Sequence, residues 1–253
     1  MTVAVVMPAW NEAEGIAGFL RELNDELARF EPVFIVVDDF SADDTADVVR
    51  AVATTGVPVQ VHVNARNMGH GPSTLRALRL GLAMNPDAIV ALDGDGQFVG
   101  ADVASVVEKL LTSQADVVEG VRRERNDPLY RRGVSAATRG LVWARTRQHP
   151  ADANTPLRAY GPVILTNLLA VLPPDASTPN LLISAICRRS GLRIMEIPVR
   201  SIPRRGSDQQ GSTWKNRRKS LPSRRFVDFC TNATREWLSA TAAPIDRDAS
   251  GSQ

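Results

Sequence analysis

The chain has 253 residues, of which 43% are apolar and 23% charged, values that are typical of a soluble globular protein with a sizeable core. Its formal net charge of +2 is small, so any basic surface must be local, and no recognition motif supports a nucleic-acid partner. Cys187 and Cys230 lie far apart and lack a partnering histidine pattern, which argues against a disulfide framework or a zinc site and favours a reducing cytoplasm.

The sequence shows no targeting or membrane-spanning segment. Its N-terminus holds an apolar run of only about six residues with no basic segment before it, so we do not expect a signal peptide. No stretch approaches the ~20 apolar residues that a membrane-spanning helix needs. We therefore expect a cytoplasmic protein. If it works at a membrane, we expect it to be peripheral, on the inner face of the plasma membrane.

Short apolar runs rich in Val and Ile predict β-strands, with helical patterns between them. The runs cover residues 3–8, 33–39, 57–63, 87–93 and 115–120. The helical patterns cover residues 11–30, 41–52 (with Ser41 as the predicted N-cap), 72–84 and 101–112. The second and fourth runs are apolar without alternation, as in strands covered on both faces. This order predicts an α/β fold, with a Rossmann-like, doubly wound and mainly parallel sheet.

Polar segments follow the first four predicted strands. They are PAWNE (8–12), the acid pair at 38–39, NARNMGHG (64–71) and DGDGQ (93–97). Ligands of such sheets bind beyond the carboxyl ends of the strands, so we expect these segments to form one site. Turn chemistry alone would explain any single cluster. It explains less well why acids recur after both the second and the fourth strand.

The second half of the sequence is less regular. Residues 122–150 are basic and predicted to be partly helical, 179–191 predict a helix that ends at Gly191, and 192–202 predict a strand. Residues 213–242 predict a basic, amphipathic helical extension, which would either seat on an anionic membrane or pack its aromatic residues on the core. Residues 243–253 are expected to be disordered.

The segment that follows the fourth predicted strand offers oxygen ligands on alternate residues, Asp93, Asp95 and Gln97. Gly94 would let the backbone turn so that both carboxylates approach one ion. Hard oxygen ligands select Mg²⁺ or Mn²⁺, ions that usually share their coordination with substrate phosphates. Taken alone, the D-x-D pattern is a weak signal, and an acidic turn without a ligand would be the better interpretation.

A set of motifs, in order along residues 3–215, resembles glycosyltransferase family 2, whose members have the GT-A fold. The first half contributes VVMPAWNEAEGI, VVDDFSADDT, NMGHG and LDGDGQF. The second half contributes GVRRERND, RRGVS, DANTPLRAY and EIPVRSIPRRGSDQQGSTW. Within the family, the likeness is greatest to the dolichol- and polyprenyl-phosphate sugar synthases. It implies one domain over residues 1–212, with a nucleotide-sugar half (1–120) and an acceptor half (121–212).

The resemblance also implies roles for individual residues. Those bordering the nucleotide would be Pro8, Trp10, Glu12, Asp38 or Asp39, Asn67, Gly69 and Asp93. Asp95 and Gln97, with Asp93 beside them, would bind the metal ion on the diphosphate. Guanidinium groups match phosphate oxygens, and those facing the acceptor would be Arg122, Arg131 and Arg204. Asp152 and Arg158 would edge the sugar and acceptor pocket. Asp95, Asp152 and the three arginines form the predicted catalytic set.

The activity implied is metal-dependent, inverting transfer of a hexose from a GDP- or UDP-sugar to a polyprenyl phosphate. A lipid phosphate is already anionic and needs cations rather than a strong base. A saccharide or small-molecule hydroxyl acceptor would need a base, with Asp152 the first candidate. A third alternative is a nucleotide-sugar-binding module without turnover. The sequence departs from the family's D-x-x-S-G-F-R element at Thr155-Pro156-Leu157, on the acceptor side.

Overall fold

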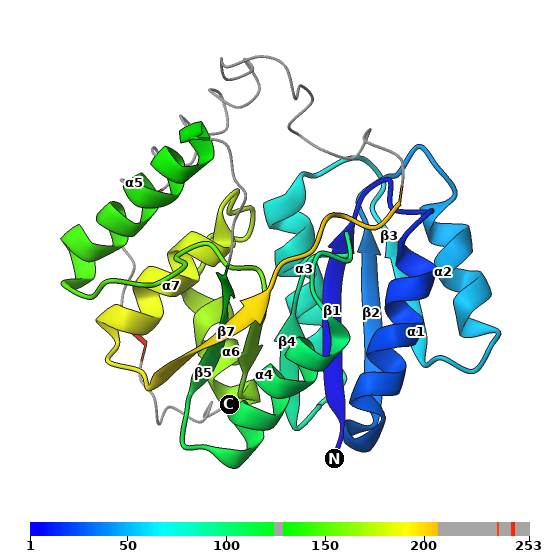
Figure 1. The fold of residues 1–253 in the computed structure, drawn as a ribbon, viewed down its shortest axis with the longest axis horizontal. Helices are drawn as coiled ribbons and strands as arrows, with labels where there is room; N and C mark the ends of the chain where they lie inside the picture. Colours follow the sequence, from blue (N-terminus) through cyan, green and yellow to red (C-terminus); the bar gives the residue numbers. More distant parts are fainter. Residues whose placement is uncertain (124–128, 207–236, 238–243, 246–253) are drawn as a thin grey trace.

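The computed structural model describes residues 1–123, 129–206, 237 and 244–245. Seven strands form one sheet in the order β3-β2-β1-β4-β6-β5-β7 (Figure 1). Their bounds are β1 Val3–Ala9, β2 Pro32–Asp38, β3 Val59–Val63, β4 Ala88–Ala91, β5 Val117–Arg123, β6 Arg158–Tyr160 and β7 Ile194–Arg200. Only β6 runs antiparallel to its neighbours, so the sheet is mainly parallel, as predicted.

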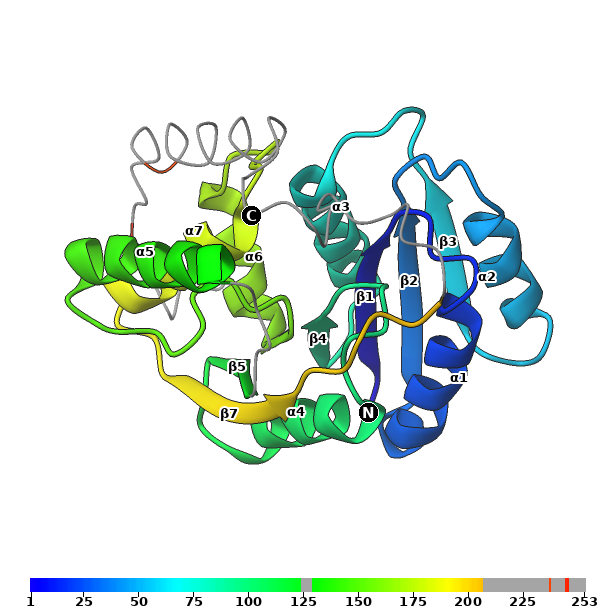
Figure 2. The same cartoon turned by 45° about the horizontal axis from the view of Figure 1, so that its top comes forward.

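Helices cover both faces of the sheet (Figure 2). Their bounds are α1 Ile16–Leu27, η1 Ala28–Phe30, α2 Thr45–Ala53, α3 His70–Ala83, α4 Gly100–Thr112, α5 Leu129–Thr146, α6 Pro162–Val171 and α7 Pro179–Arg189. Helices α1, α2 and α4 share one apolar core with one face of the sheet. Helices α3, α6 and α7 share a second core with the other face. The doubly wound architecture predicted from the sequence is therefore confirmed.

Two helices begin later than predicted, because polar residues at their expected starts serve the loops instead. Asn11 adopts a left-handed backbone conformation with φ of 54°, and α1 begins only at Ile16. The predicted N-cap Ser41 is wrong. Its hydroxyl donates a hydrogen bond to Asp38, and α2 begins at Thr45 without a side-chain cap.

The second half contains two elements that the sequence did not reveal, the short antiparallel strand β6 and helix α6. Most of the predicted extension at 213–242 and the tail at 243–253 lie outside the described residues. Trp237 is described, and it is buried in the second core with the Arg145 guanidinium 4.6 Å from its ring centre. This tryptophan therefore packs on the core. The division into halves at residue 120 stays a prediction.

Candidate active site at the carboxyl edge of the sheet

The loops that follow β1 and β2 are fastened to each other by backbone-to-side-chain hydrogen bonds. The backbone N–H of Asn11 donates to the Ser41 hydroxyl at 3.0 Å, and that of Glu12 donates to the Thr45 hydroxyl at 2.8 Å. The Asn11 amide oxygen accepts from the backbone N–H of Ala42 at 2.8 Å. Pro8 is buried in β1 and Trp10 is half-buried just after it. The loops that follow β1 and β2 are thus joined to each other at the carboxyl edge of the sheet.

Asp39 holds the loop that follows β3. Its carboxylate accepts hydrogen bonds from the Asn64 side chain and from the backbone N–H groups of Met68 and Gly69, at 2.7, 2.7 and 2.8 Å. The Asn67 side chain donates to the Asp39 backbone carbonyl at 3.1 Å. Asp39 therefore shapes the 64–69 loop, and a contact with the nucleotide base stays a prediction.

The neighbouring Asp38 is buried, and this burial raises the pKa of its carboxyl group. The Ser41 hydrogen bond acts in the opposite direction. Asp38 is the last residue of β2 and Asp39 follows it. The Asp39 carboxylate binds the 64–69 loop, whereas the Asp38 carboxylate accepts its hydrogen bond from Ser41. Its predicted role beside the base or ribose stays a prediction.

The glycines between the predicted metal ligands allow two close approaches. A Cβ atom on Gly94 would lie 2.9 Å from the Pro8 carbonyl oxygen. Gly96 has φ of 67°, and a Cβ atom there would lie 2.6 Å from the Arg205 side chain. The sequence suggested that the backbone turns at Gly94. The left-handed turn falls at Gly96 instead. It brings the Gln97 backbone N–H to 3.1 Å from an Asp95 carboxylate oxygen.

Negative charge accumulates at this loop. Burial, followed by the neighbouring Asp93, raises the pKa of Asp95 to about 7. The Nε2 atom of His70, the first residue of α3, lies 3.5 Å from an Asp93 carboxylate oxygen, a contact that the sequence did not indicate. Two carboxylates and an amide suit a hard divalent ion. Within residues 1–123 and 129–206 no three His, Cys, Asp or Glu side chains are arranged to hold a metal ion.

Glu12 and Arg204 form a two-point ion pair beside these acids. Arg204 Nη2 lies 2.7 Å and Nε 2.9 Å from the two carboxylate oxygens of Glu12, and Nη2 also donates to the Asn11 carbonyl at 2.6 Å. Burial raises the pKa of Glu12 to about 8, assisted by Asp95 and Asp93 and opposed by Arg204. Arg204, predicted to face an acceptor phosphate, is bound here by Glu12 and Asn11 of the loop that follows β1.

The segment that carries Arg204 leaves β7 and runs beside the 95–98 loop (Figure 1). Backbone hydrogen bonds join Ile202 to Gln97 and Arg205 to Asp95. Arg205, which the sequence did not single out, donates to the Gly96 carbonyl at 3.0 Å and pairs with Glu22 at 2.6 Å. A cavity of about 280 Å³ lies where this segment meets the first two loops. Its lining residues are Asn11, Glu12, Ala13, Glu14, Ala42, Asp43, Asp44, Arg204, Arg205 and Gly206.

Two of the residues that were predicted to lie near the acceptor form an ion pair. Arg122 Nε and Nη2 donate to the two carboxylate oxygens of Asp152 at 2.8 and 3.2 Å. Arg131 belongs to α5, and its side chain lies outside the described part of the chain. The expectation that Arg158 edges the pocket is wrong. Its side chain, on the interior strand β6, is fully buried against Glu119 and is therefore not exposed to a substrate in this structure.

Comparison with known proteins identifies the family. The model of the family described as "Glycosyl transferase family 2" matches residues 4–164. The chain is 28% identical over 216 residues to the undecaprenyl-phosphate 4-deoxy-4-formamido-L-arabinose transferase of Sodalis glossinidius, covering 84% of this chain but only 64% of that relative.

Solved structures share the fold. Glucosyl-3-phosphoglycerate synthase from Mycobacterium tuberculosis, in complex with Mn²⁺, UDP and glucosyl-3-phosphoglycerate, is similar at a TM-score of 0.59 and 23% identity, over 82% of this chain and 73% of that one. Mannosyl-3-phosphoglycerate synthase from Rubrobacter xylanophilus is similar at a TM-score of 0.61 and 15% sequence identity. The match covers 94% of this chain and 73% of that one. The chain described here belongs to glycosyl transferase family 2 and is a glycosyltransferase with the GT-A fold.

Proposed function

We propose that this glycosyltransferase moves a hexose from a nucleotide-diphosphate sugar, with UDP or GDP as the nucleotide, to a polyprenyl phosphate, with inversion at the anomeric carbon. The observation that carries the proposal is the acidic loop of Asp93, Asp95 and Gln97 beside the Glu12–Arg204 pair at the carboxyl edge of a parallel sheet. Undecaprenyl phosphate is part of the name of the Sodalis relative, which supports the lipid acceptor.

The residues present fit a divalent ion. Asp95 and Gln97, with Asp93 beside them, would hold Mg²⁺ or Mn²⁺ on the donor diphosphate, and the similarity to a structure that contains Mn²⁺ and UDP supports this assignment. The ion would neutralise charge that grows on the departing diphosphate. Pro8, Trp10, Glu12 and Asp38 would border the nucleotide, because they lie at or just beyond the carboxyl ends of β1 and β2.

On the acceptor side, Asp152 would hold the Arg122 guanidinium in place for an anionic acceptor. A lipid phosphate needs no strong base, and a guanidinium fixed by a two-point ion pair is suited to phosphate oxygens. Arg131 would assist from α5, and Arg204 would contribute if donor binding releases it from Glu12. In the described part of the chain, no helix is long and apolar enough to cross a membrane. We propose that the enzyme meets its lipid acceptor at the inner face of the plasma membrane.

A second candidate acceptor is a small phosphorylated hydroxy acid. The observation in its favour is the similarity to structures of two 3-phosphoglycerate glycosylating enzymes. In that case a hydroxyl group is the nucleophile and Asp152 would be the base. The arginine side chains would then hold the phosphate of the acceptor while its hydroxyl reacts.

Release of the nucleoside diphosphate tests both candidates. Purified protein is given UDP- or GDP-sugars with short polyprenyl phosphates or with 3-phosphoglycerate, in Mn²⁺ or in EDTA. We expect release of the nucleoside diphosphate to depend on the metal and to be stimulated by a polyprenyl phosphate. The second product should be an acid-labile glycosyl lipid. Stimulation by 3-phosphoglycerate alone would favour the second candidate. No release with any pair would leave a nucleotide-sugar-binding module.

A further inference from the structure

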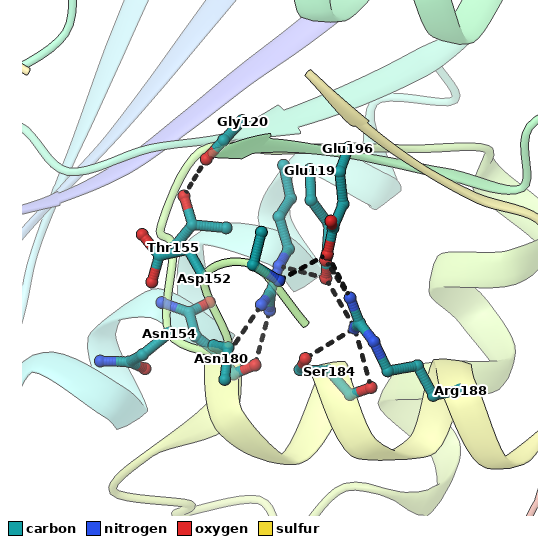
Figure 3. A network of polar contacts seen from close by, with 12 residues as sticks. Glu119, Gly120, Asp152, Asn154, Thr155, Asn180, Ser184, Arg188 and Glu196 are labelled. Carbon is teal, nitrogen blue, oxygen red and sulfur yellow. Dashed lines mark hydrogen bonds and ion pairs between the residues drawn. The ribbon is translucent and has the colours of Figure 1, made fainter. Parts of the chain in front are cut away.

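Four charged side chains on β5, β6, β7 and α7 form one network, in which Glu119, Arg158 and Arg188 are buried and Glu196 is partly exposed (Figure 3). Glu119 and Arg158 face each other across β5 and β6, with Arg158 Nε 3.1 Å from a carboxylate oxygen, and both side chains are fully buried. Arg188 of α7 donates to Glu119 at 2.8 Å and to Glu196 of β7, also at 2.8 Å. Two acids and two arginines leave the network with no net charge.

The network reaches the acceptor side through the loop that precedes β6. The Glu196 carboxylate accepts a hydrogen bond from the backbone N–H of Ala151 at 3.0 Å. Arg158 Nη2 donates to the backbone carbonyl of Ala153 at 3.1 Å. Asp152 lies between these two residues, so the network holds the chain on both sides of it. The buried side chain of Asp152 pairs with Arg122.

Two further contacts fix the same loop and anchor Arg158. The buried Thr155 hydroxyl donates to the Gly120 carbonyl at 2.5 Å, one residue beyond Glu119 on β5 (Figure 3). The other terminal nitrogen of Arg158 donates to the Asn180 carbonyl at the start of α7, at 2.6 Å. A guanidinium can bridge the two carbonyls and Glu119 at once, whereas an ammonium group lacks that fork.

We infer that Glu119, Arg158, Arg188 and Glu196 are positioning residues, which set the Asp152–Arg122 pair in the geometry that acceptor transfer requires. The inference rests on the proposed function and deepens it, because it assigns to these charges a role in the rate of transfer rather than in substrate contact. Maintaining the three charges of Glu119, Arg158 and Arg188 inside the protein is costly, and a well-packed apolar cluster could fill the same volume. Holding a loop by its backbone on both sides of one residue is a task that such a cluster could not perform.

Glu196 gives the sharpest test, because its side chain is 31% exposed and its removal leaves the Glu119–Arg158–Arg188 core intact. Glu196→Ala should lower kcat for transfer by about 10- to 100-fold, the size expected when a reacting group is misplaced by about 1 Å, and leave KM for the donor unchanged. Glu196→Gln should keep kcat within about 3-fold of the wild type, because its amide oxygen still accepts from Ala151 and Arg188. Arg158→Lys, where it folds, should lower kcat for transfer by about as much as Glu196→Ala does.

Arg193→Gln is the matched control. It breaks an ion pair with Asp116 at the amino end of β7 and touches neither the loop nor the network, so kcat should not change. Amide hydrogen exchange supplies a readout that needs no activity. Glu196→Ala should speed exchange in residues 151–155 by about 10-fold and leave residues 90–98 unchanged.

The outcomes separate the inference from the proposed function. Unchanged exchange in 151–155, or an unchanged kcat in Glu196→Ala, would overturn the positioning inference while the wild type still turns over. An equal loss of kcat in Arg193→Gln would also overturn it, because the effect would then be one of general stability. A wild type that releases no nucleotide contradicts the proposed function instead, and the exchange measurement still decides whether the network holds the loop.

Discussion

Arg204 and Glu12 are 192 positions apart in the sequence, yet they form a two-point ion pair at the edge of the sheet. The pair ties the segment that follows β7 to the loop that follows β1. It also places a guanidinium next to the acids of the 93–97 loop; burial raises the pKa of Glu12, and Asp95 and Asp93 raise it further. One contact thus joins the last described segment of the domain to the predicted donor site.

Arg204→Ala should destabilise the protein, and more so at high pH. Glu12 has an ordinary pKa of 4.5 and a folded-state pKa of about 8, so its contribution to stability is lost as the pH rises through 8. Without Arg204 the folded-state pKa rises further and the loss grows. We expect about 2–3 kcal/mol of destabilisation near pH 9 and markedly less near pH 6, as measured by urea unfolding. A difference independent of pH would show that the pair is not electrostatically coupled to the carboxyl edge of the sheet.

Asp95→Asn should abolish most of the metal response. The amide keeps the size of the side chain but loses the charge that attracts the ion, so the rise in melting temperature on adding Mn²⁺ and a nucleoside diphosphate should largely disappear. Metal-dependent release of the diphosphate should fall by about 100-fold or more. Asp87→Asn is the control, because Asp87 bonds to Thr2 at the opposite edge of the sheet. A wild-type response in Asp95→Asn would contradict the ligand assignment.

The pH dependence of metal binding follows from the same residue. Asp95 has an ordinary pKa of 3.8 and a folded-state pKa of about 7, so the metal-free protein loses stability as the pH rises through 7. A divalent ion competes with that proton, and its affinity should therefore rise over the same range. We expect calorimetry to give Mn²⁺ binding at least about 10-fold tighter near pH 8 than near pH 6, with proton release near pH 6. Equal affinities would exclude Asp95 as a ligand.

Gly96→Ala should be costly for two reasons. Its positive φ disfavours any side chain, and a Cβ atom would strike the Arg205 side chain. We expect a loss of about 1–2 kcal/mol in the free energy of unfolding and weaker binding of Mn²⁺. Gly18→Ala in α1 is the control, since a Cβ atom there meets nothing within 4 Å, and it should stabilise the helix by about 0.5–1 kcal/mol. Similar effects of the two variants would refute this account of the turn.

Arg122→Ala should separate donor from acceptor chemistry. Binding of the nucleoside diphosphate with Mn²⁺, followed by thermal shift, should be unchanged, whereas transfer to polyprenyl phosphate should fall by about 100-fold. Arg122→Lys should recover only part of the loss, because lysine lacks the two-point fork. Full activity of Arg122→Ala would place the acceptor phosphate elsewhere.

The sequence predicted the parallel part of the sheet well because each strand there is an apolar run that must be covered on both faces, a property that is local in the chain. Strand β6 was not predicted because it has only three residues, one of them the buried Arg158, and so contains no apolar run. Helix α6 did offer a signal, a proline at its first turn followed by an apolar run.

The candidate site was predicted in part. The acids at the strand ends could be placed together because parallel strands end at one edge. The partners of the arginines could not, since Arg204 meets Glu12, and Arg158 meets Glu119, only through tertiary packing. The contact between His70 and Asp93 has the same origin, because the start of α3 and the end of β4 become neighbours only in the folded sheet.

A crystal structure with Mn²⁺ and a nucleoside diphosphate, using anomalous scattering at the manganese edge, tests the central claim most directly. We predict one anomalous peak about 2.0–2.3 Å from an Asp95 carboxylate oxygen and from the Gln97 amide oxygen, with diphosphate oxygens completing the coordination. A peak held by other residues, or a bound nucleotide with Asp95 and Gln97 turned away from its phosphates, would contradict the account.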